Sequence, residues 1–109
     1  MRRPRPDAGD RLARALHVGL SALGAQTAIE ERTSRDWASI TFSGERHRLT
    51  LSLPGPGAQA AVDTFLDGLE DREFALRGQL LADIEATGVA RDADGQIRLT
   101  LEALTVEES

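Results

Sequence analysis

The chain has 109 residues, a formal net charge of −5 and no cysteine. It is therefore expected to form one domain, without disulfides, thiolate catalysis or cysteine-ligated zinc. All 13 positive charges are arginines, so the chemistry of a Schiff-base or P-loop lysine is excluded, and the acidic balance argues against nucleic-acid and anionic membrane partners.

Residues 1–6 carry three arginines and two prolines and no apolar run, so we expect a disordered arm ahead of a single domain over residues 7–109. Residues 7–23 predict an amphipathic helix with Asp7 as its N-terminal cap. Its apolar face recurs at helical spacing: Leu12, Leu16, Gly19, Leu20 and Leu23.

Residues 26–53 predict a three-strand meander with tight turns at Ser34-Arg35 and Gly44-Glu45. This register gathers the apolar residues on one sheet face: Ile29, Ala38, Ile40, Phe42, Leu49 and Leu51. The opposite face is polar, with Arg46 and Arg48, except for Trp37. Two interpretations of Trp37 stay open, a contact with a partner protein or a ring that lies over a strand end beside Arg32. His47 is expected to be a hydrogen-bonded histidine near the apolar side.

A second helix is predicted over residues 58–70, after the break Pro54-Gly55-Pro56-Gly57. Its buried face comprises Ala58, Val62, Phe65, Leu66 and Leu69. The exposed face and the C-terminal end of this helix are acidic, which predicts a solvated surface.

Residues 73–107 predict one long β-hairpin around a three-residue loop, Ala93-Asp94-Gly95, with Gly95 left-handed. This loop pairs Val89 with Leu99, Thr87 with Leu101, Ile84 with Leu104, and Ala82 with Val106. The apolar side then changes face near Gly88 and Ala103. Either a β-bulge corrects the change, or the two halves of the hairpin bury opposite sides.

These elements predict an α+β two-layer sandwich, in which two amphipathic helices cover one face of a five-stranded antiparallel sheet. The order is α-β-β-β-α-β-β, with a long C-terminal β-hairpin. This order, the size and the acidic charge are similar to those of type III secretion chaperones. The resemblance implies a dimer that wraps an extended partner segment, and it assigns no residue.

No motif predicts catalysis, a cofactor or a metal site, so we expect a non-enzymatic, cytoplasmic interaction domain. Asp83 and Glu85 share a strand face, an arrangement that fits either an acid/base pair or an ordinary solvated strand. The loop at 90–101 lacks the bidentate acid of a calcium site. No run is apolar and long enough to cross a membrane.

The overlong hairpin predicts a homodimer, because its second apolar side needs cover. The expected interaction residues are Trp37, Leu81, Val89, Leu99, Leu101, Leu104 and Val106. A second hypothesis is a small-molecule or peptide site between sheet and helices. It would be lined by Phe42, His47, Phe65 and Phe74.

Overall fold

The computed structural model describes residues 7–108, so the predicted arm at residues 1–6 lies outside the described residues. The elements along the chain are α1 (Ala8–Ser21), β1 (Ala28–Ala38), β2 (Ser43–Leu53), α2 (Ala58–Leu66), a 3-10 turn η1 (Leu69–Asp71), β3 (Gln79–Arg91) and β4 (Ile97–Glu107). The predicted α+β class with an antiparallel sheet and two helices is confirmed.

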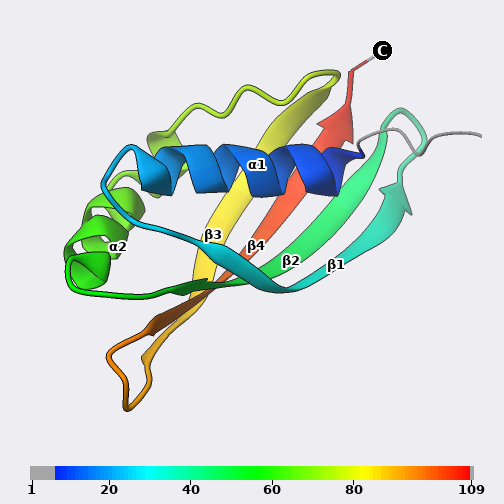
Figure 1. Ribbon diagram of the computed structural model, residues 1–109. Coiled ribbons are helices and arrows are strands. Elements are labelled where there is room, and N and C mark those ends of the chain that lie inside the picture. The colour runs from blue at the N-terminus through cyan, green and yellow to red at the C-terminus, as the bar shows by residue number, and fades with distance from the viewer. Residues whose placement is uncertain (1–6, 109) are drawn as a thin grey trace, which may run out of the picture.

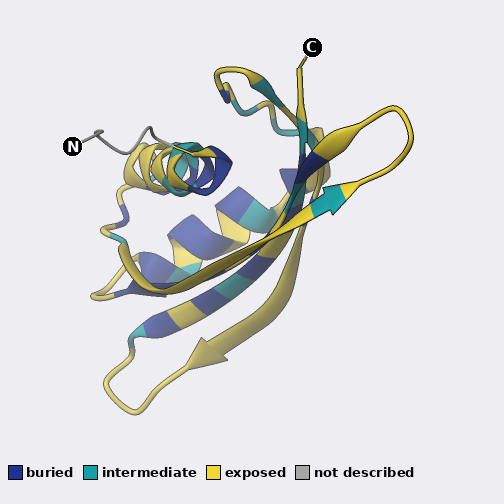
Figure 2. Ribbon diagram, turned by 90° about the vertical axis from the view of Figure 1, so that its right-hand side faces the viewer, coloured by how far each residue is buried: buried dark blue, intermediate teal, exposed yellow. Residues whose placement is uncertain are grey.

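The four strands form one antiparallel sheet in the order β1-β2-β4-β3. Two hairpins, β1–β2 and β3–β4, join along the β2–β4 ladder, which runs from Gly44 opposite Val106 to Leu53 opposite Ile97. Both helices lie on the same side of this sheet (Figures 1 and 2). Within the described residues, the sheet therefore has one face covered by helices and one without a helix over it, and we call these the covered face and the open face.

Helix α1 begins as the sequence predicts, at a capping box. The Asp7 side chain accepts a hydrogen bond from the Asp10 backbone N–H at 2.8 Å, and the Asp10 carboxylate accepts one from the Asp7 N–H at 3.2 Å. Three leucines at i, i+4 and i+8 then face the sheet and are completely buried: Leu12, Leu16 and Leu20. This spacing docks α1 across the sheet.

The predicted second helix is shorter than expected, because it ends at Leu66. Gly68 then adopts a left-handed backbone (φ 76°), and the single turn η1 follows. Only glycine takes this conformation without steric cost. Phe65 of α2 packs close to Gly19 of α1, where an added Cβ would lie 3.0 Å from the ring. The glycine therefore leaves room for an aromatic side chain of α2.

The core lies between the covered face and the two helices. Alternate residues of β2 and β4 point into it, as the dark stripes in Figure 2 indicate. They are Leu49, Leu51 and Leu53 of β2 and Ile97, Leu99 and Leu101 of β4. The period of two along both strands is that of a half-buried sheet.

The predicted meander is wrong, and with it the count of five strands and their order. Ser34 and Arg35 lie inside β1, and Gly44 and Glu45 lie inside β2, so one hairpin of two 11-residue strands replaces three short ones. Its turn is at residues 39–42, closed by the Ser39 N–H donating to the Phe42 carbonyl at 2.7 Å. Of the expected apolar face, only Leu49 and Leu51 are buried, whereas Ile29, Ile40 and Phe42 are exposed.

The physical reason is the long β2–β4 ladder. It pairs β2 along its whole length with the distant strand β4. A meander with a turn at Gly44 would have removed the first residues of that ladder. Local turn chemistry is a weak preference, and the non-local pairing outweighs it.

The C-terminal hairpin has the predicted three-residue loop. The Asp92 N–H donates to the Gln96 carbonyl at 3.0 Å across the loop 93–95, and Gly95 is left-handed (φ 80°). Val89 pairs with Leu99, as expected. The ladder then shifts twice, between Ala86 and Gly88 and between Leu81 and Asp83.

On β4, which pairs without interruption, Leu104 and Val106 still point to the side opposite Leu99 and Leu101. On β3, two bulges correct the change of face that the sequence indicated near Gly88. They also make three of the predicted pairs wrong, those of Thr87 with Leu101, Ile84 with Leu104 and Ala82 with Val106. Ile84 pairs with Ala103, Ala86 pairs with Leu101, and Leu80 pairs with Val106. The first arm begins at Gln79, six residues later than expected at residue 73.

Candidate functional site

The open face is built by the strand residues whose side chains point away from the helices. On β2, His47, Leu49 and Leu51 point into the domain and are buried, so their neighbours Arg46 and Arg48 point outward and are exposed. Because residues that pair across neighbouring strands point to the same side of a sheet, the same alternation holds for β1, β3 and β4. The result is a four-strand surface with no helix over it, within the described residues (Figure 2).

An apolar corner occupies one end of the open face, formed by Trp37, Leu80, Leu104 and Val106. Trp37 lies opposite Gly44, Gly44 lies opposite Val106, and Val106 lies opposite Leu80, so the row crosses all four strands. Leu104 belongs to the next row, opposite Arg46. Leu80 remains 56% exposed and the other three side chains are half-buried.

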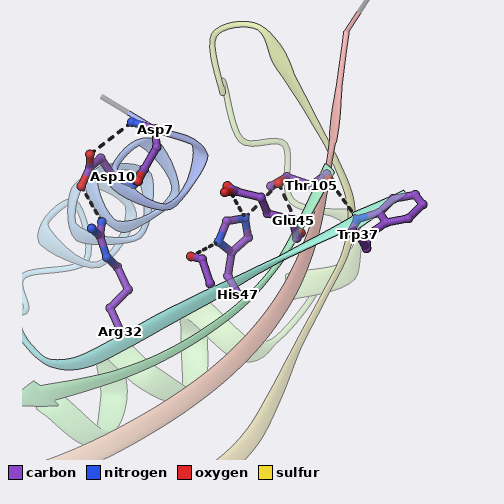
Figure 3. Close-up of polar contacts among 8 residues, drawn as sticks. Asp7, Asp10, Arg32, Trp37, Glu45, His47 and Thr105 are labelled. Atoms are coloured by element: carbon purple, nitrogen blue, oxygen red, sulfur yellow. Dashed lines mark hydrogen bonds and ion pairs between the residues drawn. The ribbon is translucent and has the colours of Figure 1, made fainter. Parts of the chain in front are cut away.

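Trp37 is held in place by the backbone of β4. Its indole Nε1 donates to the Thr105 carbonyl at 3.3 Å, and Figure 3 shows the ring pointing away from α1. The neighbour Gly44 leaves no room for a side chain, since an added Cβ would lie 1.9 Å from the Thr105 oxygen and 3.0 Å from the indole nitrogen. The expected contact with Arg32 is wrong, because Arg32 pairs with Asp10 of α1 at 2.6 Å on the covered side.

The charges on the open face are segregated at the end that carries the apolar corner, while at the other end Arg98 of β4 forms an ion pair with Glu30 of β1 at 2.8 Å. A basic half lies on β1 and β2, with Arg35, Arg46 and Arg48. An acidic half lies on β3 and β4, with Asp83, Glu85 and Glu102. Arg35 lies directly opposite Arg46, and Glu85 lies directly opposite Glu102. Like charges at such positions destabilise a sheet.

All six of these charged side chains are exposed. Among the residues that the structure describes, none of the six forms a hydrogen bond or an ion pair through its side chain. Arg48 and Glu102 lie directly opposite each other in the β2–β4 ladder, but their side chains form no ion pair. These six charges are therefore uncompensated within residues 7–108.

A polar cluster lies on the covered face, at the end nearest to Asp7 (Figure 3). The buried His47 contacts the Ser34 hydroxyl through Nδ1 at 2.8 Å and the Thr105 hydroxyl through Nε2 at 2.9 Å. Burial lowers the pKa of His47, so the ring is held neutral. Burial is also the main cause that raises the pKa of Glu45, with Asp7 and Asp36 adding to it.

The distance between Ser34 and His47 would suit a nucleophile and its base. However, both ring nitrogens are occupied by hydroxyls, and the side chain has no exposed surface. The expected hydrogen-bonded histidine is confirmed, and this cluster ties β1, β2 and β4 together. Over residues 7–108 no three His, Asp or Glu side chains gather where they could hold a metal ion.

The predicted interaction residues are divided by the sheet. Trp37, Leu104 and Val106 lie on the open face. Leu99 and Leu101 are fully buried in the core, so the expectation that they meet a partner is wrong.

Leu81 and Val89 belong to the covered side of β3, through their pairs Thr105 and Leu99. Leu81 packs against the core, and Val89 is 48% exposed near the hairpin turn. Sequence reasoning missed Leu80 and the charged residues as members of one site. The sequence signal for the charged residues is a like charge at every second position, at Arg46 and Arg48 and again at Asp83 and Glu85. Only the strand order brings these two pairs onto one surface.

The second predicted site, a cavity between sheet and helices, does not form from the expected residues. Phe42 is 58% exposed in the β1–β2 turn, while Phe65 and Phe74 meet edge to face with ring centres 6.3 Å apart. A surface groove lies instead beside β3. It is lined by Glu70, Asp71, Arg72, Glu73, Phe74 and Gln79–Ile84.

Comparisons with protein-family models, with curated proteins and with solved structures found no match for this chain. The resemblance to type III secretion chaperones loses its main support, because it rested on an element order that the structure does not have. Within residues 7–108, no helix is both long enough and apolar enough to cross a membrane.

Proposed function

We propose that this protein is a small non-enzymatic interaction module that self-associates, and that the open face is its docking surface. The sequence led us to expect association through the C-terminal hairpin. In this proposal the hairpin supplies half of the surface, with Leu80, Leu104 and Val106, and β1 and β2 supply the other half.

The observation that carries the proposal is a sheet face that no described helix covers and that holds six charged side chains without a partner within residues 7–108. A solvated face of an antiparallel sheet is common. In such a face, however, charges of opposite sign normally alternate and offset each other across strands. Here they are segregated beside an apolar corner that holds the only tryptophan of the chain, and tryptophan and arginine are enriched at protein interfaces.

The proposal is tested by substitutions on the two sides of the molecule. We expect light scattering at micromolar concentration to give the mass of a dimer for the unaltered chain and of a monomer for Leu104→Asp. Val18→Asp is the matched control, because Val18 is 60% exposed on α1, and it should stay dimeric. Circular dichroism verifies that both variants are folded.

A monomeric unaltered protein, or a Leu104→Asp variant that stays dimeric, would contradict the proposal. Trp37→Ala gives an independent measure of the same surface. It removes the apolar ring from the corner without adding a charge, and we expect it to weaken the dimer at least tenfold.

A second candidate is peptide binding in the groove beside β3, and one observation favours it. Two buried side-chain atoms have no hydrogen-bond partner in the described structure, Arg72 Nε and Gln79 Oε1, and both residues line the groove. A peptide backbone offers an acceptor to the first and a donor to the second. Because four carboxylates also line it, those of Glu70, Asp71, Glu73 and Asp83, the peptide would be basic.

Titration with an arginine-rich peptide, followed by fluorescence anisotropy, tests this candidate. The candidate predicts saturable binding that Gln79→Leu weakens. Equal binding by Gln79→Leu would reduce the interaction to non-specific charge attraction.

A further inference from the structure

We infer that two copies of this chain stack their open faces around a two-fold axis that runs parallel to the strands, between β2 and β4. This inference deepens the proposed function and rests on it. It identifies the occupant of the open face as a second copy and specifies its orientation.

A two-fold axis in this direction exchanges the two sides of the sheet while keeping position along the strands. β1 of one copy then lies over β3 of the other, and β2 lies over β4. The strand order β1-β2-β4-β3 places the basic half on one side of this axis and the acidic half on the other. The basic half of each copy therefore lies over the acidic half of the second copy.

The register gives the individual pairs. Arg48 and Glu102 are opposite each other in the β2–β4 ladder, so the axis sets Arg48 of one copy over Glu102 of the other, twice. In the neighbouring row, Arg35 and Asp83 take the two outer positions, and Arg35 of each copy faces Asp83 of the second copy. An isologous interface makes every such contact in duplicate.

The apolar corners coincide as well. The row that runs from Trp37 through Gly44 and Val106 to Leu80 lies at one end of the sheet. Because the axis preserves position along the strands, the two rows stack on each other. Trp37 of one copy then covers the exposed Leu80 of the other.

The other in-plane two-fold axis, perpendicular to the strands, is disfavoured by the same charges. It lays β2 over β2 and β4 over β4. Through the central row it would bring Arg48 against Arg48 and Glu102 against Glu102. Like charges in contact across an interface are strongly unfavourable, so the segregation of charge selects one orientation.

The size of the surface suits a dimer. Four strands about 4.8 Å apart and about 36 Å long present a face of roughly 700 Å². A standard interface buries about 800 Å² per partner. Stacked sheets also keep their strand directions within about 30° of each other, so the expected pairs stay within reach of long side chains.

Stacking would also resolve the like-charge pairs. Arg35 beside Arg46 and Glu85 beside Glu102 are unfavourable in one copy. In the stacked pair the row of Arg35 and Arg46 lies over Asp83 and Leu104, and the row of Glu85 and Glu102 lies over Thr33 and Arg48, so each like-charge pair meets one opposite charge. The cross-strand repulsion in each monomer is thus offset by attraction between copies.

The test uses two single charge reversals and their mixture. In Arg48→Glu alone the central contacts become carboxylate against carboxylate, and in Glu102→Arg alone they become guanidinium against guanidinium. We expect each variant by itself to associate at least tenfold more weakly than the unaltered chain. In a one-to-one mixture the two substituted side chains face each other with opposite charges, and the unaltered Glu102 of the first variant faces the unaltered Arg48 of the second. A heterodimer should therefore form.

Native mass spectrometry of the mixture, with one variant isotope-labelled, counts the heterodimer directly. Recovery in the mixture but not in either variant alone supports the inference, because positions 48 and 102 within each chain still carry like charges in the mixture. No recovery, while Leu104→Asp still dissociates the unaltered dimer, would overturn the stacking and leave the docking surface in place. A Leu104→Asp variant that stays dimeric would instead overturn the proposed function.

Discussion

The two faces of the sheet differ in burial and in how their polar groups are paired, although they are made by alternate residues of the same strands. On β4, Leu99 and Leu101 are fully buried on the covered face, while Arg98 and Glu102 point outward. On β2 and β4 the covered face is apolar except for the cluster around His47, whose two ring nitrogens both have hydroxyl partners. The open face keeps six charges with no partner in the part of the chain that the structure describes.

This difference separates what stabilises the monomer from what is available for function. The covered face stabilises the fold by removing leucine side chains from water. The open face contributes little to that stability, and its like-charge pairs oppose it. Substitutions should therefore have separable effects, on folding from one face and on association from the other.

The largest effect on folding is expected for Leu101→Ala on the covered face. Truncation of a fully buried leucine costs about 2–5 kcal/mol, because it also leaves a cavity. Leu104→Ala, three residues along the same strand, removes a half-buried side chain and should cost about 1 kcal/mol. Urea denaturation of dilute protein measures both, and equal losses would contradict the division between the faces.

A smaller loss in the free energy of unfolding is expected for Gly44→Ala, which tests how Trp37 is held against β4. The new Cβ would lie 1.9 Å from the Thr105 carbonyl, and such overpacking costs about 1–3 kcal/mol. Gly88→Ala is the matched control on β3, because a Cβ there meets its nearest atom at 3.9 Å. We expect Gly88→Ala to leave the free energy of unfolding unchanged or to raise it, and a cost as large as that of Gly44→Ala would refute the steric explanation.

The smallest effect is a pH dependence that arises at His47. Its pKa is lowered in the folded protein from an ordinary value of 6.5, so below that pH the unfolded chain binds a proton that the folded chain does not. Stability is therefore complete above about pH 6.5 and falls on acidification, by at most about 1.4 kcal/mol per pH unit. Glu45, whose pKa is raised, acts in the opposite direction as its carboxylate protonates.

Urea denaturation between about pH 7.5 and 5.5, on either side of the ordinary pKa of histidine, measures how the free energy of unfolding depends on pH. His47→Gln should abolish the slope in that interval. The control His17→Gln, on the exposed side of α1, should retain it. A slope that survives in His47→Gln would assign the acid sensitivity to another group.

Local patterns in the sequence predicted the elements whose signals act over a few residues. Asp7 and Asp10 form the expected cap, the leucines of α1 face inward, and the loop 93–95 closes the long hairpin with Gly95 left-handed. The need for a bulge near Gly88 was also visible, since the apolar parity of the two arms did not match. These features depend on helical spacing, on capping and on the backbone freedom of glycine.

The tertiary structure alone decided the length of β1 and β2 and the strand order. Two residue pairs have the composition of turns but are extended within strands, Ser34-Arg35 in β1 and Gly44-Glu45 in β2. The reason is that pairing β2 with β4 along its whole length outweighs two weak turn preferences. The same order brings residues from four strands onto the open face. No local pattern contains that order, so the segregated charges and the apolar corner became one surface only in the folded chain.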